Sequence, residues 1–197
     1  MTIPALPAAS MVIIDDRPDL HVLIGRRRPG AFVGGMIVYP GGAVDPEDWR
    51  VGPTRCGGIS APGLDADEAA GYLHAAIRES REEVGLWPDP EVNVDGGDFA
   101  AVGHWITPED APRRYDTRFF LARHPGGEAR VADDELVDVW WERPTDALAR
   151  LDAGELDAIA PTISFLTALS QYRHVDDAFA GTEHEIQRVS DWGVTTF

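Results

Sequence analysis

Short runs rich in β-branched, aromatic and other apolar residues occur along most of the chain, and each predicts a β-strand. The first two runs are separated by Asp16-Arg17-Pro18-Asp19, whose proline and aspartates favour a turn, so these runs predict a hairpin. The third run ends at Pro40-Gly41-Gly42, where the chain must turn sharply or approach another group closely. The predicted strands are residues 10–15, 21–26, 36–39, 99–105, 117–122 and 136–141.

A helical pattern replaces these short runs in the middle of the chain. Apolar residues recur near helical spacing from Ala69 to Val84, the acids before them suit a helix N-terminus, and Gly85 suits the end. This predicts a helix over residues 67–83, and the sequence favours two more at 144–153 and 162–172. Strands and helices alternate without regular βαβ spacing, which predicts an α/β fold whose mixed β-sheet is flanked by helices.

Residues 45–64 form a long stretch of proline, glycine, aspartate and serine with little periodicity, which predicts a loop without secondary structure. Loops of this length inside a compact domain are more often functional than decorative. The 197 residues, 44% of them hydrophobic, suffice for one large domain, so we expect a single domain over 1–197 with a C-terminal helix and tail at about 160–197.

Composition excludes several classes of function. The formal charge of −17 argues against a protein that binds nucleic acid polymers, which would need a basic face. Cys56 is the one cysteine, so an intrachain disulfide and a thiolate zinc site are both excluded. The N-terminus does not resemble a signal peptide, and no apolar run reaches the length that crosses a bilayer. We therefore expect a cytoplasmic protein that has no membrane partner.

The central helix carries a cluster of acids at one end. Glu79, Glu82 and Glu83 lie at positions i, i+3 and i+4, which places their carboxylates on one helix face. Two such charges about 5 Å apart repel by roughly 3 kcal/mol at an effective dielectric constant of about 20. A hard divalent cation, Mg²⁺ or Mn²⁺, would compensate this repulsion, with Arg78 orienting a carboxylate. The alternative is an ordinary solvated face with weak surface ion pairs.

The sequence of this helix argues against a merely solvated acidic face. The segment Arg78-Glu79-Ser80-Arg81-Glu82-Glu83-Val84-Gly85-Leu86, preceded by Pro40-Gly41-Gly42, resembles the Nudix box, G-x5-E-x7-R-E-U-x-E-E-x-G-U with U aliphatic. The resemblance implies an α/β/α sandwich in which the three glutamates ligate metal, Glu82 and Glu83 take part in catalysis and Arg78 orients a glutamate. It also implies hydrolysis of a nucleoside diphosphate derivative, in which water attacks one phosphorus and metal neutralises the developing charge.

The box is split in this chain. Arg78 follows Gly42 by 36 positions (78 minus 42), whereas the continuous box has 14, so the insertion is 22 residues (36 minus 14), centred on about 46–64. The first glutamate of the pattern has no clean equivalent, and Asp48, Asp67 or Glu68 could replace it. Ser80 stands where the pattern has an aliphatic residue, which removes no ligand.

The split is similar to a branch of Nudix enzymes that includes the peroxisomal coenzyme A diphosphatase. Residues 30–45, 105–108 and 113–120 are similar to the same branch. This similarity implies coenzyme A or an acyl-coenzyme A as the substrate. ADP-ribose, dinucleotides and oxidised nucleoside triphosphates are alternatives, as is a Nudix module that senses a nucleotide without turnover.

Other polar residues are candidates for contact with the substrate. Arginines can bind phosphate in a bidentate manner, and the two glycines allow close approach. The predicted substrate-binding residues are Arg26, Arg28, Gly41, Gly42, Arg114 and Arg118. For the arginines at 26 and 28, an exposed basic patch is an equal alternative.

Glu135 precedes a predicted strand, where many family members place an additional acid that serves as base or metal ligand. A solvated acidic turn is the alternative for Glu135. Trp192 and Phe197 are apolar for a free chain end, so the tail could pack on a second subunit in a homodimer.

Overall fold

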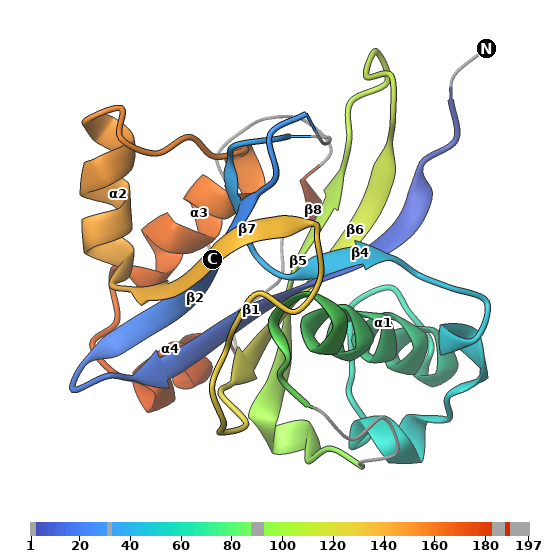
Figure 1. Cartoon of the computed structure of the whole chain (residues 1–197). Helices are drawn as coiled ribbons and strands as arrows, with labels where there is room; N and C mark the ends of the chain where they lie inside the picture. The colour runs from blue at the N-terminus through green and yellow to red at the C-terminus, as the bar shows by residue number, and fades with distance from the viewer. Residues whose placement is uncertain (1–2, 31–32, 88–92, 183–187, 190–197) are drawn as a thin grey trace.

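A computed structural model describes residues 3–30, 33–87, 93–182 and 188–189 of the chain. Strands come before and after the longest helix, and helices predominate after residue 143 (Figure 1). The strands are β1 (Leu6–Asp16), β2 (Leu20–Arg27), β3 (Ile37–Val38), β4 (Gly41–Ala43), β5 (Phe99–Ile106), β6 (Tyr115–Arg123), β7 (Leu136–Glu142) and β8 (Arg188–Val189). The α-helices are α1 (Ala66–Val84), α2 (Pro144–Asp152), α3 (Ala160–Leu169) and α4 (Val175–Gly181).

Within the described residues the strands form one eight-stranded mixed sheet in the order β3-β2-β1-β6-β5-β8, with β4 beside β1 and β7 beside β2. The pairs β1–β6 and β5–β8 are parallel, and the remaining pairs are antiparallel. The predicted hairpin is confirmed, because Ile14 pairs with Val22 across the turn. The strand β1 begins at Leu6, earlier than the predicted start at Ser10, because its first part pairs with both β4 and β6.

Successive residues of β1 face opposite sides of the sheet and enter two separate hydrophobic cores. Met11 and Ile13 pack on the side of α1, whereas Val12 and Ile14 pack on the side of α2, α3 and α4. Figure 1 shows α1 on one side of the sheet and α2 and α3 on the other. The predicted α/β/α sandwich with a mixed sheet is therefore confirmed.

Helix α1 begins and ends where the sequence predicts, because both ends are capped. Asp65 accepts a hydrogen bond from the backbone of Glu68, and the Glu68 side chain accepts one from the backbone of Asp65, which completes a capping box. Gly85 ends the helix with a left-handed φ of 72°. The helix therefore holds its acidic C-terminal turns in a fixed place against β1 and β4.

The insertion is folded, and the prediction of a loop without secondary structure is wrong. Two 3₁₀ helices, η1 (Asp48–Arg50) and η2 (Pro53–Cys56), pack on α1. Cys56 is buried and its thiol donates to the carbonyl of Ala70 at 3.5 Å, while the Trp49 ring contacts Tyr72 edge-on with centroids 5.1 Å apart. Such short 3₁₀ turns leave no periodic pattern that a sequence could show.

The C-terminal region contains two helices where the pattern predicts one over 162–172. Helix α3 begins earlier, since Pro161 suits a first helical turn, and α4 follows after a short connection. Trp192 and Phe197, on which the homodimer prediction depends, lie outside the described residues. None of the helices in the described part of the chain is long and apolar enough to cross a membrane.

Candidate active site

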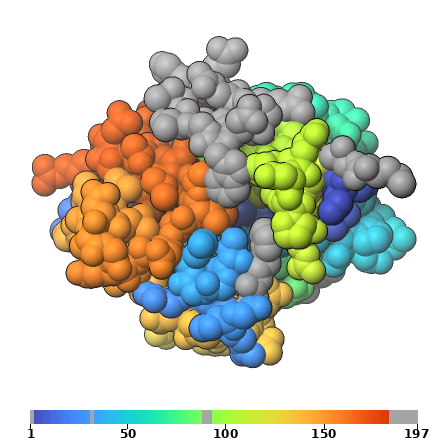
Figure 2. Space-filling model, turned by 90° about the horizontal axis from the view of Figure 1, so that it is seen from above, coloured from blue at the N-terminus to red at the C-terminus, as the bar shows by residue number. Residues whose placement is uncertain are grey.

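The acidic end of α1 lies beneath a cavity of about 840 Å³. Strand β4, the end of β2, the β5–β6 loop, the loop before β7 and the start of α3 all contribute to its lining. Figure 2 looks down on this face, on which the blue segment after β2, the lime β5–β6 loop and the orange segments around α3 lie next to one another. Elements distant in the sequence thus share one site.

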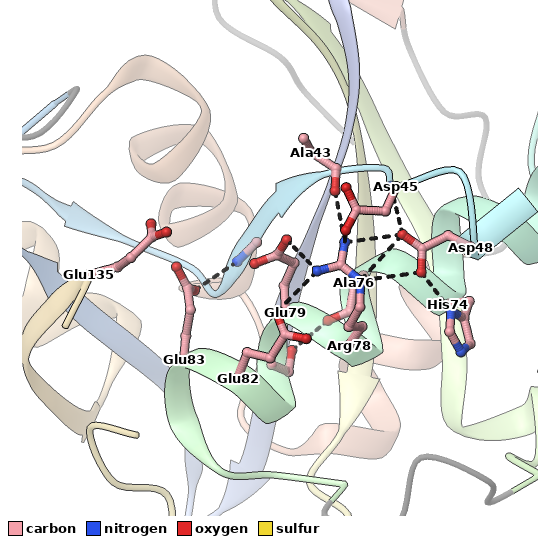
Figure 3. A network of polar contacts seen from close by, with 12 residues as sticks. Ala43, Asp45, Asp48, His74, Ala76, Arg78, Glu79, Glu82, Glu83 and Glu135 are labelled. Atoms are coloured by element: carbon pink, nitrogen blue, oxygen red, sulfur yellow. Dashed lines mark hydrogen bonds and ion pairs between the residues drawn. The ribbon is translucent and has the colours of Figure 1, made fainter. Parts of the chain in front are cut away.

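Arg78 is the centre of a polar network at this end of α1 (Figure 3). Its Nη1 donates to Glu79 at 2.8 Å and to Glu82 at 3.1 Å, and its Nη2 donates to the carbonyl of Ala43 at 2.9 Å. The other edge of the guanidinium donates to both oxygens of Asp48, at 3.0 Å from Nη2 and 3.3 Å from Nε. Arg78 therefore ties α1 to β4 and to the insertion, and it fixes two of the three predicted acids.

Asp48 is the insertion acid that meets Arg78, and its side chain is fully buried. Burial raises its pKa, but hydrogen bonds from His74 at 2.7 Å and from Arg78 lower it further, so the pKa of Asp48 lies below its ordinary value. Glu68 is instead engaged at the helix N-terminus, and Asp67 is exposed in the same turn. Of the three acids left open by the sequence, Asp48 therefore pairs with the arginine.

Glu83 has a buried carboxylate, one oxygen of which has no hydrogen-bond partner among the described residues. Its Oε2 accepts from the backbone N–H of Gly41 at 3.0 Å, whereas its Oε1 is buried without a hydrogen-bond partner. Burial, together with the negative charges of Glu79 and Glu135, raises the pKa of Glu83 to about 8 against the Gly41 hydrogen bond and Arg27. Burial also raises the pKa of Glu79. Such a cluster favours a cation as a neighbour.

Gly41 and Gly42 bring the backbone of β4 into contact with its surroundings. A Cβ atom on Gly42 would lie 2.5 Å from the carboxylate of Glu79, and one on Gly41 would lie 2.4 Å from the carbonyl of Ala9. Both glycines line the cavity, as predicted, and only glycine permits their close approach.

The predicted convergence of Glu79, Glu82 and Glu83 is not present as a formed ligand group. Among the described residues, no three His, Cys, Asp or Glu side chains are placed together to hold a metal ion. The reason is that Arg78 engages oxygens of Glu79 and Glu82. Figure 3 nevertheless shows Glu79, Glu83 and Glu135 on the same side of the network. Their all-oxygen, anionic chemistry and the unpartnered Glu83 Oε1 fit Mg²⁺ or Mn²⁺.

Comparison with known proteins identifies the family of this chain. The family model described as NUDIX domain matches residues 4–162. The chain belongs to the Nudix family. It is 25% identical over 199 aligned residues to "Putative nudix hydrolase 7" of Caenorhabditis elegans, covering 86% of this chain and 62% of that protein, so it spans less than two thirds of that relative.

Solved structures extend the comparison to the fold. The crystal structure of a NUDIX hydrolase from Alicyclobacillus acidocaldarius is 30% identical, with a TM-score of 0.77 over 91% of this chain and 97% of that one. The MutT protein from Methanosarcina mazei is 15% identical, with a TM-score of 0.52 over 87% and 96% of the two chains, and shows the likeness of fold alone.

Ser80 replaces an aliphatic residue of the Nudix box, and its buried hydroxyl donates to the carbonyl of Ala76 at 2.7 Å.

The arginines around the Nudix site differ from those predicted. Arg28 lines the cavity, but three of the predicted substrate-binding residues do not. Arg26 lies over Trp140, Arg114 donates to the carbonyls of Ile3, Thr107 and Pro108, and Arg118 donates to the carbonyl of Pro62.

Arg27 and Arg113 line the cavity instead. Strict alternation along β2 places Arg27 on the side of Leu23, which faces α1, and this signal in the sequence separates it from Arg26. Glu135 also lines the cavity, and its role as an additional base or metal ligand stays a prediction.

Proposed function

We propose that this chain is a metal-dependent pyrophosphohydrolase that cleaves the diphosphate linkage of a nucleoside diphosphate derivative. The observation that carries this proposal is the buried Glu83 carboxylate, which keeps an unpartnered oxygen beside Glu79 and Glu135 beneath a large cavity. A buried, underpaired carboxylate is costly unless a cation satisfies it, and buried acids with raised pKa values mark functional sites.

Glu79, Glu82 and Glu83 are the residues that would hold Mg²⁺ or Mn²⁺. When bound, the cation supplies charge neutralisation on the diphosphate and lowers the pKa of attacking water. Arg78 orients Glu79 and Glu82 through its two Nη1 hydrogen bonds, and Asp48 holds Arg78 from behind. If Glu79 and Glu82 release Arg78, the arginine therefore stays attached to the insertion through Asp48.

The reaction adds one water across the P–O–P linkage and gives two phosphate products. The water oxygen forms a bond to one phosphorus, the bridging oxygen leaves with the other phosphate, and a carboxylate at the site takes up the water proton. Glu135 is the candidate acceptor of this proton, because it lines the cavity and its side chain is half exposed. Arg27 and Arg28 lie where bidentate donors can orient the phosphate oxygens.

Coenzyme A or an acyl-coenzyme A is the substrate we favour, on the resemblance of the split box. The cavity combines basic residues with apolar ones such as Val33, Val38 and Phe119, which suits a ligand with a diphosphate and a larger organic part. ADP-ribose, dinucleotides and oxidised nucleoside triphosphates remain in the same chemical class.

A hydrolysis screen tests the proposal. Coenzyme A, ADP-ribose, a dinucleoside polyphosphate and a nucleoside triphosphate are incubated with the protein and Mg²⁺ or Mn²⁺, and ³¹P NMR detects the products. We expect at least one diphosphate to be cleaved, with loss of turnover on addition of EDTA. Binding of these compounds without any cleavage would refute catalysis and indicate a sensing module.

A matched pair of variants links the turnover to the site. Glu83→Gln retains an acceptor for the Gly41 N–H but removes the charge, so we expect turnover to fall by about a hundredfold or more. Glu47→Gln changes an exposed acid paired with Arg50 and serves as the control. Equal rates in the two variants would contradict the assignment.

A further inference from the structure

Arg27 joins two acids that belong to different elements. Its side chain leaves the end of β2, and its Nη2 donates to Glu135 Oε2 at 2.5 Å. Its Nη1 lies 3.9 Å from Glu83 Oε1. One guanidinium thus lies between the acid on α1 and the acid in the loop before β7.

This contact is incomplete on both sides. A separation of 3.9 Å is too long for a hydrogen bond, and Glu83 Oε1 has no partner although it is buried. The Nε of Arg27 is also buried without a hydrogen-bond partner in the described part of the chain. A well-formed arginine–carboxylate pair would have two parallel hydrogen bonds. Arg27 therefore forms a hydrogen bond to Glu135 but leaves Oε1 of Glu83 without one.

We propose that Arg27 competes with the divalent cation for Glu83, one of the three acids that would hold the cation. The proposal rests on the proposed function, because it needs a metal site that includes Glu83. Both positive groups are attracted to the same carboxylate, and like charges repel at this range. The guanidinium is displaced as the cation binds, and the cavity that Arg27 already lines gives it space beside the substrate phosphates.

A fixed structural role for Arg27 would have the opposite consequence. If Arg27 merely held Glu83 in place for the metal, its removal would leave that acid free to move, and metal affinity would fall. The sign of the change in affinity therefore separates the two roles.

Calorimetric titration with Mn²⁺, without substrate, measures this sign for Arg27→Gln. We expect Mn²⁺ to bind about tenfold more tightly, as follows from removing one like charge about 5 Å from a dication in a hydrated cavity. We also expect the melting temperature without Mn²⁺ to fall, because Glu83 and Glu135 lose their counterion. The stabilisation by added Mn²⁺ should grow correspondingly.

Arg28→Gln is the matched control. Arg28 is the next residue, lines the same cavity and carries the same charge, but it pairs with the exposed Asp134 at 3.2 Å. We expect its Mn²⁺ affinity to stay within about a factor of two of the unmodified protein, because an exposed and well-hydrated charge acts weakly.

Arg27→Lys is a second variant, which keeps the test informative if Arg27→Gln fails to fold. Lysine keeps the charge but lacks the fork that spans both acids, so we expect Mn²⁺ affinity between those of the unmodified protein and Arg27→Gln. Unchanged or weaker Mn²⁺ binding in Arg27→Gln would overturn the competition while leaving the metal site intact. If the unmodified protein bound no Mn²⁺, both the competition and the proposed function would fail.

Discussion

Removing the Asp48 carboxylate should destabilise the protein although it lies in an insertion. In Asp48→Ala, Arg78 loses its hydrogen bonds to both oxygens, and His74 loses its partner at 2.7 Å. Breaking a buried ion pair costs about 3–5 kcal/mol. Since Arg78 keeps Glu79 and the carbonyl of Ala43, we expect the lower end, about 3 kcal/mol. For a chain of this size that lowers the melting temperature by about 6–12 °C.

Urea unfolding followed by circular dichroism measures the change in the free energy of unfolding. Asp45→Ala is the control, because Asp45 lies 3.8 Å from Arg78 but is more than half exposed, and we expect a loss below about 1 kcal/mol. Asp67→Ala tests another acid that the sequence left open, and we expect a loss below about 1 kcal/mol there too. An equal loss in Asp48→Ala and Asp45→Ala would refute the reasoning.

Turnover of Asp48→Ala should also fall, since an unanchored Arg78 no longer fixes Glu79 and Glu82. A double-mutant cycle with Arg78→Ala isolates this contact, and a coupling free energy of about 1–3 kcal/mol is expected for residues in one network. Additive effects of the two substitutions would show that Asp48 acts on something other than Arg78.

Three further substitutions or conditions test other parts of the structure. Gly42→Ala places a Cβ 2.5 Å from the Glu79 carboxylate, so turnover should fall by about a hundredfold as Glu79 moves, and an unchanged rate constant would contradict this crowding. Burial raises the pKa of Cys56 to about 11, so a thiol reagent at pH 8 should modify it only after denaturation, and rapid labelling of the native protein would disagree. Burial lowers the pKa of His124 below its ordinary 6.5, so the unfolded chain binds this proton at a higher pH than the folded protein does. The free energy of unfolding should therefore decrease as the pH falls below about 6.5. If His124→Gln showed the same dependence of this free energy on pH, His124 would be excluded as its cause.

Most of the fold could be predicted because its signals are local. The short apolar runs of β1 and β2, and the capping residues Asp65 and Gly85, determine elements from neighbouring residues alone. The two 3₁₀ helices of the insertion were missed, since their stability comes from packing on α1 and leaves no periodicity.

The site residues could be predicted only in part, because side-chain direction depends on tertiary contacts. The box glutamates, Arg78 and Glu135 lie at the site, whereas Arg114 and Arg118 are engaged by backbone carbonyls that no local pattern indicates. The partner of Arg78 could not be chosen from the sequence, because Asp48 lies in the insertion, where no fixed spacing relates it to Arg78. A single domain over 1–197, a homodimer and a cytoplasmic location stay predictions.

The attachment of Asp48 to Arg78 has a consequence for how such chains evolve. Asp48 lies six positions after Gly42 (48 minus 42), and the residues between Asp48 and α1 line no part of the cavity. The structure requires the contact between the Asp48 carboxylate and the Arg78 guanidinium, but it does not require a fixed number of residues between them. Relatives could therefore lengthen or shorten this stretch while keeping their chemistry, and a search that demands a fixed spacing would overlook them.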